Sequence, residues 1–425
     1  MQERSTGKSN TTASAVEAPP TTIRSVAVIG AGYVGLPLSL HLAKVGLKVT
    51  AVDIDPTVVA EINERRAKVE EKEDFEKYFR DPDVQRNLSA STTPVKADAF
   101  IIAVPTPIYE DSKEPDLRAV TAATESIAPL VERGNLVIVE STIPPHTTEK
   151  IVAPILEKSG LKAGTDFLLA HCPERILPGN IMAEAVYNAR IIGGIDEEST
   201  RAAAALMGTF VKGKLLATNA RTAEFVKLIE NSYRDVNVAF ANQVAVLCDD
   251  LGIDAGEVIS LANEHPRVDI LDPGIGVGGH CIPVDPWFLV HARPESASLI
   301  RSARLMNDSI PARTAAKILQ AVADVEHPRV VCLGASYKPN VRDLRESPAL
   351  HVFELLRGEG LDVSLYDPLI PEYACDSVLS AARGADLLAI LVPHEMIVTE
   401  IRYRRGAVLD AMRRPRIMAF SPGVI

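Results

Sequence analysis

This sequence lacks the signals that mark several specialised classes of protein. Its five cysteines are scattered over 425 residues and never form a C-x-x-C pair. That pattern argues against a disulfide framework and a zinc site, so we expect reduced thiols and no bound metal. There is no dense run of Lys and Arg, and the net charge is -11, which gives no electrostatic footprint for a polyanion. We therefore expect no nucleic-acid partner.

Long apolar runs are missing as well. No stretch reaches about 18 consecutive uncharged apolar residues, so no membrane-spanning helix is expected. Residues 1–22 lack the apolar block of a secretory signal, and their polar, Pro-containing composition predicts a disordered tail. Together with the reduced thiols, these absences favour a cytoplasmic protein with no membrane partner.

What the sequence does contain is an alternation of β-branched runs with amphipathic segments. Such an alternation predicts an α/β fold with a parallel sheet, and a chain of this length is expected to form two or three domains. The strand-like runs are SVAVIG, LKVTAVDID, AFIIAVPTP, NLVIVES and FLLAHCP.

Two later segments divide the chain further. Residues 222–251 contain no Gly or Pro and keep apolar residues at helical spacing. They predict a helix about 45 Å long, which would join domains or pair subunits. A second α/β unit begins near His327, with Ser347 as N-cap and Pro348 as first residue of a helix. The predicted parts are residues 23–218, 219–318 and 319–425.

The first strand leads into a G-x-G-x-x-G turn, and Asp53 ends the next strand. Gly30 permits the tight turn, Gly32 lets the backbone approach a pyrophosphate, and Gly35 lets helix and strand pack closely. Asp53 can bond ribose hydroxyls and would repel a 2′-phosphate. This context favours an NAD site of the Rossmann type over a glycine-rich turn without a ligand. Two further residues of the turn are assigned to the cofactor site, Tyr33 and Val34.

A second glycine-rich segment, PGIGVGGHCIPVDPWFL, surrounds Cys281 and places Asp285 four residues later. Glycines this dense remove side chains around one thiol, which would let a bulky substrate reach it. The alternative is a structural cysteine that behaves as a small apolar residue.

The chain also carries long motifs in a fixed order: GAGYVGLPL, AVPTP, ESTIPPHTT, HCPERILPGN, TAEFVKLIENSYRDVN, HPRVDIL, GVGGHCIPVDPWF and YKPNVRDLRESPA. Together they resemble the UDP-glucose/GDP-mannose dehydrogenase family over nearly the whole chain, and three of them look most like its UDP-N-acetyl-D-mannosamine 6-dehydrogenase branch. The resemblance implies an N-terminal Rossmann-like NAD domain, a central helical dimerisation domain with the long helix, and a C-terminal Rossmann-like UDP-sugar domain.

The resemblance further implies a four-electron oxidation, in which a sugar C6 alcohol becomes a carboxylate and two NAD molecules are reduced. Cys281 matches the family's nucleophile, which forms a thiohemiacetal and then a thioester. Glu174 matches an acid/base glutamate and Asp285 the aspartate paired with the cysteine loop. Pro178 stands where the UDP-glucose branch has a second glutamate, so hydrolysis must depend on Glu174 or another group.

Lys227 and Asn231 match residues that stabilise charge on the C6 oxygen, and with Glu224 they fall on one face of the long helix. The alternative for Lys227 is a solvated lysine. Thr142 matches a threonine near the catalytic water, with helix capping as its alternative. The family pattern also extends the cofactor site to Pro105, Thr106 and Thr142.

For the substrate, Arg267 resembles an arginine that reaches the site of a neighbouring subunit, which implies a homodimer. Lys338 and Arg345 match nucleotide-binding positions. Arg342 is our own inference from the same loop, and it has a solvated surface charge as its alternative. The other residues assigned to the UDP-sugar are Glu174, Arg175, Lys227, Asn231 and Gly278.

The expected product is UDP-N-acetyl-D-mannosaminuronate, a precursor for surface polysaccharide or glycan. UDP-N-acetylglucosamine, UDP-glucose or GDP-mannose are alternative substrates. A non-catalytic NAD-binding regulator, or a two-electron hydroxyacid dehydrogenase with the same first domain, is the alternative of a different class.

Overall fold

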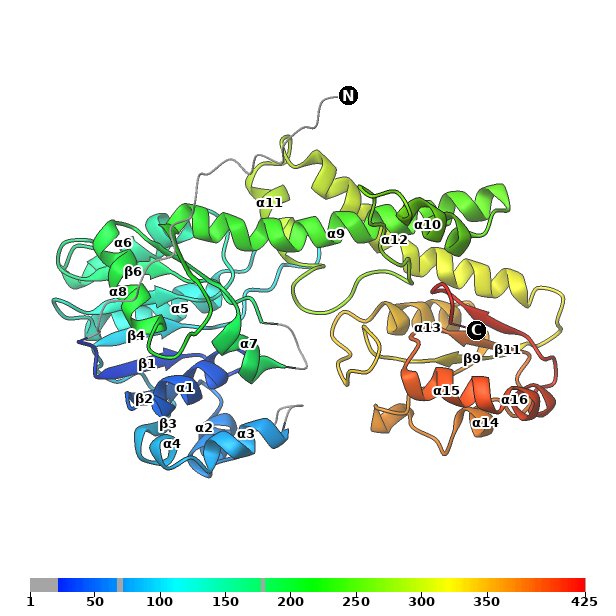
Figure 1. Ribbon diagram of the computed structural model, residues 1–425, viewed down its shortest axis with the longest axis horizontal. Helices are drawn as coiled ribbons and strands as arrows, with labels where there is room; N and C mark the ends of the chain where they lie inside the picture. The colour runs from blue at the N-terminus through cyan, green and yellow to red at the C-terminus, as the bar shows by residue number, and fades with distance from the viewer. Residues whose placement is uncertain (1–21, 67–71, 177–179, 425) are drawn as a thin grey trace. The chain divides into compact units, whose positions relative to one another are not determined.

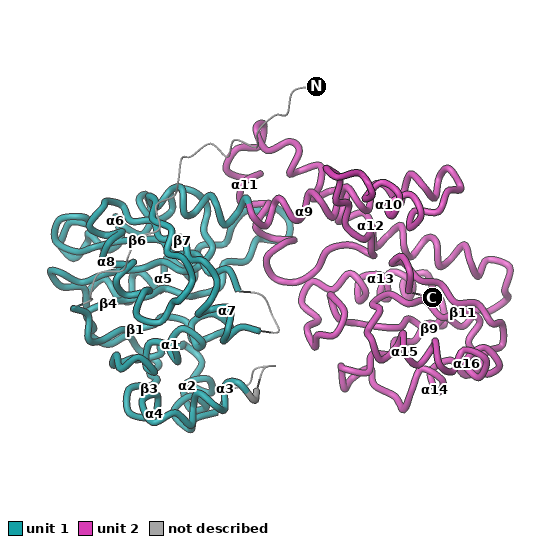
Figure 2. Tube along the Cα trace, in the orientation of Figure 1, with its two compact units in different colours: residues 1–229 teal, residues 230–425 magenta. Residues whose placement is uncertain are grey.

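The computed structural model describes residues 22–66, 72–176 and 180–424. Almost all of the predicted disordered tail, and Pro178, lie outside this part of the chain. The chain divides into two compact units, which Figure 2 colours separately and which we call the N-terminal unit and the C-terminal unit: residues 1–229 and 230–425.

The N-terminal unit is built on an eight-stranded sheet with the order β3-β2-β1-β4-β5-β6-β7-β8 (Figure 1). Neighbouring strands are parallel, as the sequence predicts, except that β7 runs antiparallel to β6. The order reverses at β1 and β4, and the carboxyl ends of strands beside such a point form the usual ligand crevice. The strands are β1 Ser25–Ile29, β2 Lys48–Val52, β3 Leu88–Ser91, β4 Ala99–Ile102, β5 Leu136–Val139, β6 Leu168–His171, β7 Arg190–Gly194 and β8 Leu215–Asn219.

Helices cover both faces of this sheet because its central strands β1, β4 and β5 are apolar on both sides. Val26 and Val28 of β1 join a core with α1, α3, α7 and α8, while Ala27 and Ile29 join a core with α5 and α6. The helices are α1 Gly35–Lys44, α2 Pro56–Asn63, α3 Lys72–Phe79, α4 Pro82–Asn87, α5 Arg118–Ile127, α6 Ala153–Leu156, α7 Ile181–Tyr187 and α8 Glu197–Met207, with short helical turns η1 Ala128–Leu130, η2 Thr148–Val152 and η3 Glu157–Ser159.

The predicted long helix is confirmed as α9, Ala220–Leu251, which has 32 residues. At 1.5 Å per residue it is about 48 Å long. Residues 220–229 of this helix belong to the N-terminal unit and the remainder to the C-terminal unit. Among the helices described, none combines the length and apolarity needed to cross a bilayer.

The C-terminal unit continues with three helices and then the predicted second α/β fold. Its four-stranded sheet is parallel throughout, with the order β10-β9-β11-β12. The prediction for the helix α13 is confirmed, because Ser347 caps it and Pro348 begins it. The elements are α10 Ala255–Asn263, α11 Asp285–Ala292, α12 Ser298–Ala321, β9 Arg329–Leu333, α13 Pro348–Gly358, β10 Asp362–Tyr366, η4 Pro371–Tyr373, α14 Val378–Ala381, β11 Leu387–Ile390, α15 Glu395–Tyr403, α16 Arg405–Ala411 and β12 Ile417–Ala419.

The last residues of the chain had no interpretation from sequence. They form the edge strand β12, and residues 419–424 then line a cavity of about 420 Å³ together with residues of α9, α10 and α12. The C-terminal segment therefore packs on the helices of its own unit.

Candidate active site

The glycine turn after β1 has the geometry that a dinucleotide requires. Gly30 has a φ of +95°, and a Cβ there would lie 2.5 Å from the carbonyl oxygen of Ala103. A Cβ on Gly35 would clash with the Gly30 carbonyl, so this glycine lets α1 pack against β1. Around Gly32, in contrast, a Cβ would meet nothing within 4 Å. The protein's own packing does not require that glycine, and the space beside it is open to a pyrophosphate.

Asp53 directly follows β2 at the same edge. One carboxylate oxygen accepts a hydrogen bond from Ala31 N at 2.9 Å, and the other accepts one from Asp55 N at 3.0 Å. The side chain is half-buried, so its remaining acceptor positions can receive ribose hydroxyls. The residues present thus fit NAD. The other predicted cofactor residues lie at this edge too: Tyr33 and Val34 between the glycines, and Pro105 and Thr106 after β4.

The C-terminal unit repeats this turn. Gly334 follows β9 with a φ of +91°, and a Cβ on it would lie 2.5 Å from Val392. Ala335 N donates to Asp367 Oδ2 at 2.7 Å, as Ala31 N does to Asp53. Asp367 is fully buried, however. Its carboxylate serves the protein itself.

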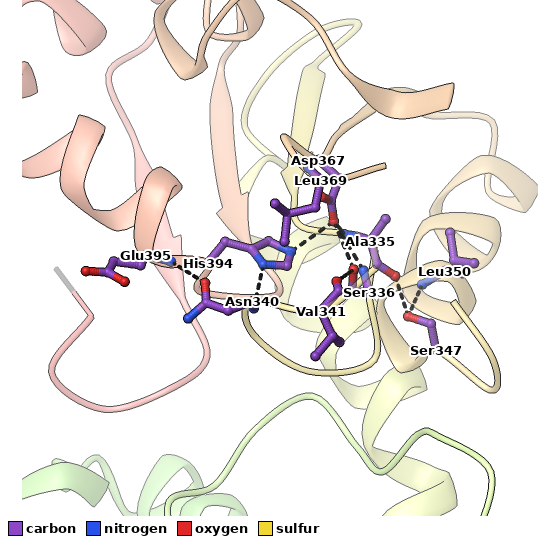
Figure 3. Close-up of polar contacts among 10 residues, drawn as sticks. All are labelled: Ala335, Ser336, Asn340, Val341, Ser347, Leu350, Asp367, Leu369, His394 and Glu395. Atoms are coloured by element: carbon purple, nitrogen blue, oxygen red, sulfur yellow. Dashed lines mark hydrogen bonds and ion pairs between the residues drawn. The ribbon is translucent and has the colours of Figure 1, made fainter. Parts of the chain in front are cut away.

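Asp367 and His394 hold the loop that follows β9, as Figure 3 shows. His394 Nε2 lies 2.9 Å from Asp367 Oδ2, and His394 Nδ1 accepts from Asn340 N at 2.9 Å. Because a backbone N–H can only donate, Nδ1 is the acceptor and Nε2 carries the hydrogen. The Ser336 hydroxyl donates to the carbonyl of Val341. The network therefore fixes the loop over residues 336–341.

The whole segment between β9 and α13, residues 334–347, is called the nucleotide loop because it carries the three basic residues predicted to bind the nucleotide. Arg345 is paired with Asp343 through Nε at 3.0 Å, and its side chain remains partly exposed. Lys338 Nζ lies 5.8 Å from the centre of the Tyr337 ring, and Arg342 is exposed. A preorganised loop with exposed cations ahead of the α13 N-terminus suits a diphosphate.

The segment before α11, residues 273–284, is called the cysteine loop, and it packs directly on the nucleotide loop. Gly279 N donates to the carbonyl of Arg345 at 3.0 Å. A Cβ on Gly278 would clash with the carbonyl of Glu346 and lie 2.7 Å from Tyr337 and Pro348. Cys281 is exposed, so the alternative of a structural buried cysteine is wrong.

Asp285 connects the cysteine loop to α9. Its backbone N–H donates to the Cys281 carbonyl at 2.8 Å, and its carboxylate accepts from Asn231 Nδ2 at 2.6 Å. Both side chains are buried. Lys227 lies one helical turn before Asn231 and is only 9% exposed, so the alternative of a solvated lysine is wrong.

Glu174 lies beyond β6. Its ion-pair partner, Arg190, follows from the antiparallel pairing of β7 with β6. Ala170 pairs with Gly194 and His171 with Gly193, and this register, if continued, places Glu174 opposite Arg190. Glu174 Oε2 indeed lies 2.7 Å from Arg190 NH2. Sequence reasoning missed Arg190.

Glu140, at the end of β5, was missed as well. It contacts Arg190 NH1. Burial and the nearby Glu174 carboxylate raise the pKa of Glu140 to about 8, although Arg190 opposes the shift. A charged residue directly after an apolar strand was the available sequence signal. The same edge also holds Arg175, whose guanidinium donates to the carbonyl of Ala189 at 2.8 Å.

Two predicted residues stand apart from these contacts. Thr142 is half-buried and follows β5 and Ser141, while the next helical turn is preceded by Thr147, so the capping alternative for Thr142 is wrong. Arg267 is exposed in the loop after α10. None of the five cysteines forms a disulfide.

Comparison with known proteins gives the same domain order. Three family models match the NAD binding domain, the central domain and the UDP binding domain of the UDP-glucose/GDP-mannose dehydrogenase family, at residues 24–211, 221–309 and 331–417. The predicted arrangement of two Rossmann-type domains and a helical central domain is therefore confirmed.

Relatives match along most of the chain. A UDP-N-acetyl-D-mannosamine dehydrogenase from Methanocaldococcus jannaschii is 46% identical over 88% of this chain and 86% of its own length. An NDP-N-acetyl-D-galactosaminuronic acid dehydrogenase from Ralstonia solanacearum is 43% identical over 88% of this chain and 91% of its own. The solved structure of a UDP-D-ManNAc dehydrogenase from Pyrococcus horikoshii matches with a TM-score of 0.87 at 40% identity, covering 94% of this chain and 96% of that one. The chain therefore belongs to the UDP-glucose/GDP-mannose dehydrogenase family, and it is an NAD-dependent UDP-sugar dehydrogenase.

Proposed function

We propose that this enzyme oxidises the C6 alcohol of UDP-N-acetyl-D-mannosamine to the carboxylate, through a covalent intermediate on Cys281. The observation that carries the proposal is an exposed thiol in a loop of glycines that packs on the nucleotide loop. Relatives named for N-acetylmannosamine support the choice of sugar. The product, UDP-N-acetyl-D-mannosaminuronate, would serve surface polysaccharide or glycan synthesis.

The chemistry has three steps. In the first, the C6 alcohol loses a proton and a hydride and becomes an aldehyde. The Cys281 thiol then adds to the aldehyde carbon, and the thiohemiacetal loses a second proton and hydride to become a thioester. In the third, water forms a C–O bond as the C–S bond breaks, which releases the carboxylate. Bound NAD supplies the hydride acceptor for both oxidations.

The chain's polar residues have distinct parts in this scheme. Lys227 and Asn231 stabilise negative charge on the C6 oxygen, and the Asn231–Asp285 hydrogen bond fixes the amide that would donate to it. Asp285 also holds the backbone of Cys281. Glu174 accepts the proton of the hydrolytic water, and Thr142 would hold that water.

Substrate binding falls to the nucleotide loop and its neighbours. Lys338, Arg342 and Arg345 bind the diphosphate, and Gly278 lets the cysteine loop pack closely against the loop that carries them. Glu174 and Arg175 contact the sugar. None of the five cysteines forms a disulfide, which is consistent with the proposed cytoplasmic location, where thiols are kept reduced.

A homodimer completes the proposal. Large apolar residues lie exposed on one stripe of α9, spaced by four or seven residues: Phe225, Ile229, Tyr233, Phe240, Leu247 and Leu251. A second copy of the chain would bury this stripe, and Arg267 would reach the site of the partner. In analytical ultracentrifugation, Leu247→Asp should yield monomer, while Arg234→Asp, exposed on another side of the helix, should not. A dimeric Leu247→Asp would contradict this interface.

The test of the reaction is a substrate panel with NADH stoichiometry. UDP-N-acetylmannosamine should give two NADH per sugar, and faster turnover of the N-acetylglucosamine, N-acetylgalactosamine, glucose or GDP-mannose compounds would reassign the substrate. Cys281→Ala should abolish carboxylate formation while NAD binding survives. Cys375→Ala is the matched control because Cys375 is also exposed. A single NADH per sugar, or full activity of Cys281→Ala, would refute the mechanism.

A further inference from the structure

A buried cluster of three charged side chains lies at the carboxyl edge of the N-terminal sheet. Arg190 contacts Glu140 through NH1 and Glu174 through NH2. The side chain of Glu140 is 0% exposed, that of Arg190 2% and that of Glu174 12%. Only Glu174 therefore has access to a substrate.

The charges of this cluster do not balance. One guanidinium faces two carboxylates, which leaves one net negative charge in a buried place when both are ionised. Glu140 Oε2 is buried and receives no hydrogen bond from any described group. A proton taken up by the pair would neutralise the cluster and give that oxygen a hydrogen.

The titratable groups beside the cluster do not supply the positive charge that would balance it. The Cys172 thiol is buried, and burial raises its pKa far above the usual range, so it is neutral. His41 lies near Arg190, and burial together with that guanidinium lowers the pKa of His41 to about 4, so it is neutral as well. Phe210 covers the guanidinium with its ring, whose centre lies 5.9 Å away.

We propose that Glu140 and Arg190 are positioning residues that make Glu174 an effective proton acceptor, and that the three side chains together take up one proton during thioester hydrolysis. This inference rests on the proposed function. Arg190 orients the Glu174 carboxylate. Glu140 competes for the same guanidinium and adds a like charge, so that Arg190 does not hold Glu174 as an inert ion pair.

The step balances as follows. Water attacks the acyl carbon on Cys281, the C–O bond forms, the C–S bond breaks, and the sulfur leaves as a thiolate. One proton of the water passes to Glu174, and the cluster changes from one negative charge to none. The second proton of the water passes to the Cys281 thiolate, so that the product leaves as the carboxylate and the thiol is regenerated. The proton held by the cluster then returns to solvent before the next turnover. Burial and the nearby Glu174 carboxylate raise the pKa of Glu140, so the buried pair takes up a proton more readily than a lone exposed carboxylate would.

Glu140→Gln tests this directly because glutamine keeps the shape and removes the second negative charge. The variant should release two NADH per subunit in a burst and then turn over at least about tenfold more slowly than the native enzyme. Intact-protein mass spectrometry should show the sugar acyl group accumulating on Cys281. A variant without burst or adduct, and with the native pH profile, would overturn the proposal.

Asp386→Asn is the matched control. Asp386 is also a buried carboxylate paired with an arginine, Arg413, but it lies in the C-terminal unit. It should lose stability without accumulating an adduct. A purely structural role of Glu140 would make the two variants behave alike.

The native enzyme gives an independent test that does not depend on the variant's folding. The lifetime of the adduct should lengthen as the pH falls, because a protonated pair cannot accept the proton of the hydrolytic water. A lifetime that does not vary with pH would overturn the proposal. Failure of the proposed function is distinguishable, since the native enzyme would then form neither an adduct nor two NADH per sugar.

Discussion

Asp53 and Asp367 end equivalent strands of the two sheets, and each accepts a hydrogen bond from the residue that follows the turn glycine, yet only Asp53 reaches the surface. The distances from Ala31 N and Ala335 N are 2.9 and 2.7 Å. Asp367 is bound to His394 as well. The carboxylate of Asp53 thus remains available to a ribose, whereas that of Asp367 is occupied by hydrogen bonds within the protein.

Asp53→Asn should therefore weaken NAD binding about tenfold, because a charge-assisted hydrogen bond to the ribose is replaced by a neutral one. The substitution should also reduce the preference of the enzyme for NAD over NADP, since the charge that repels a 2′-phosphate is removed. Calorimetric Kd values for both dinucleotides measure the two effects. An unchanged ratio of the two values would show that Asp53 does not set the preference.

Gly278→Ala should raise the KM for the UDP-sugar and lower kcat, each by about tenfold or more, because its Cβ would push the cysteine loop off the carbonyl of Glu346. Gly274→Ala, in the same loop, meets nothing within 4 Å and should remain near native. Steady-state kinetics compare the two variants, and unchanged NAD binding shows that both remain folded. Equal kinetics would mean that the two loops are not coupled.

Asn231→Asp should lower kcat about 100-fold, since it removes an amide donor and places a second carboxylate against buried Asp285. Two such groups cannot both ionise cheaply, so the variant should also lose thermal stability as the pH rises. Asn237→Asp, on the same helix and bonded to the carbonyl of Tyr233, is the control. Native kcat in Asn231→Asp would remove Asn231 from the reaction.

His41→Phe should reduce the sensitivity of the protein to acid. Burial and Arg190 lower the pKa of His41 from 6.5 to about 4, so between these values the unfolded chain binds a proton that the native state does not. Stability is fully present above 6.5 and is lost as the pH falls, by about 2 kcal/mol at about pH 5. Phenylalanine keeps the packing on Tyr78 and Phe210. Urea unfolding at neutral and acid pH measures the difference, and identical pH dependence in both proteins would contradict it.

The parts of the site that could be predicted are those fixed by local backbone chemistry. The turn at Gly30 and Gly35, the α13 cap at Ser347 and the helix over residues 222–251 each depend on a few consecutive residues. Cys281 was proposed as the nucleophile because its glycine-rich segment resembles a motif of the family, since the glycines alone also allow a structural cysteine.

The contacts could not be predicted because they depend on strand direction and on distant elements. The partnership of Glu174 with Arg190 follows from the antiparallel register of β7, whereas the sequence predicted a parallel sheet. The Asn231–Asp285 hydrogen bond joins residues 54 positions apart. Neither contact can be recognised from the residues of a single sequence segment.

The second glycine turn has a consequence for the evolution of this architecture. Gly334 keeps the left-handed backbone and the close approach to Val392 that Gly30 has toward Ala103, although it belongs to a UDP binding domain. The first glycine of such a turn is thus required where two neighbouring strands meet, and a domain with this turn can bind a different ligand and still need the glycine. Ligand identity would drift first at positions such as Gly32, where the surrounding space is open and selection by the fold is absent.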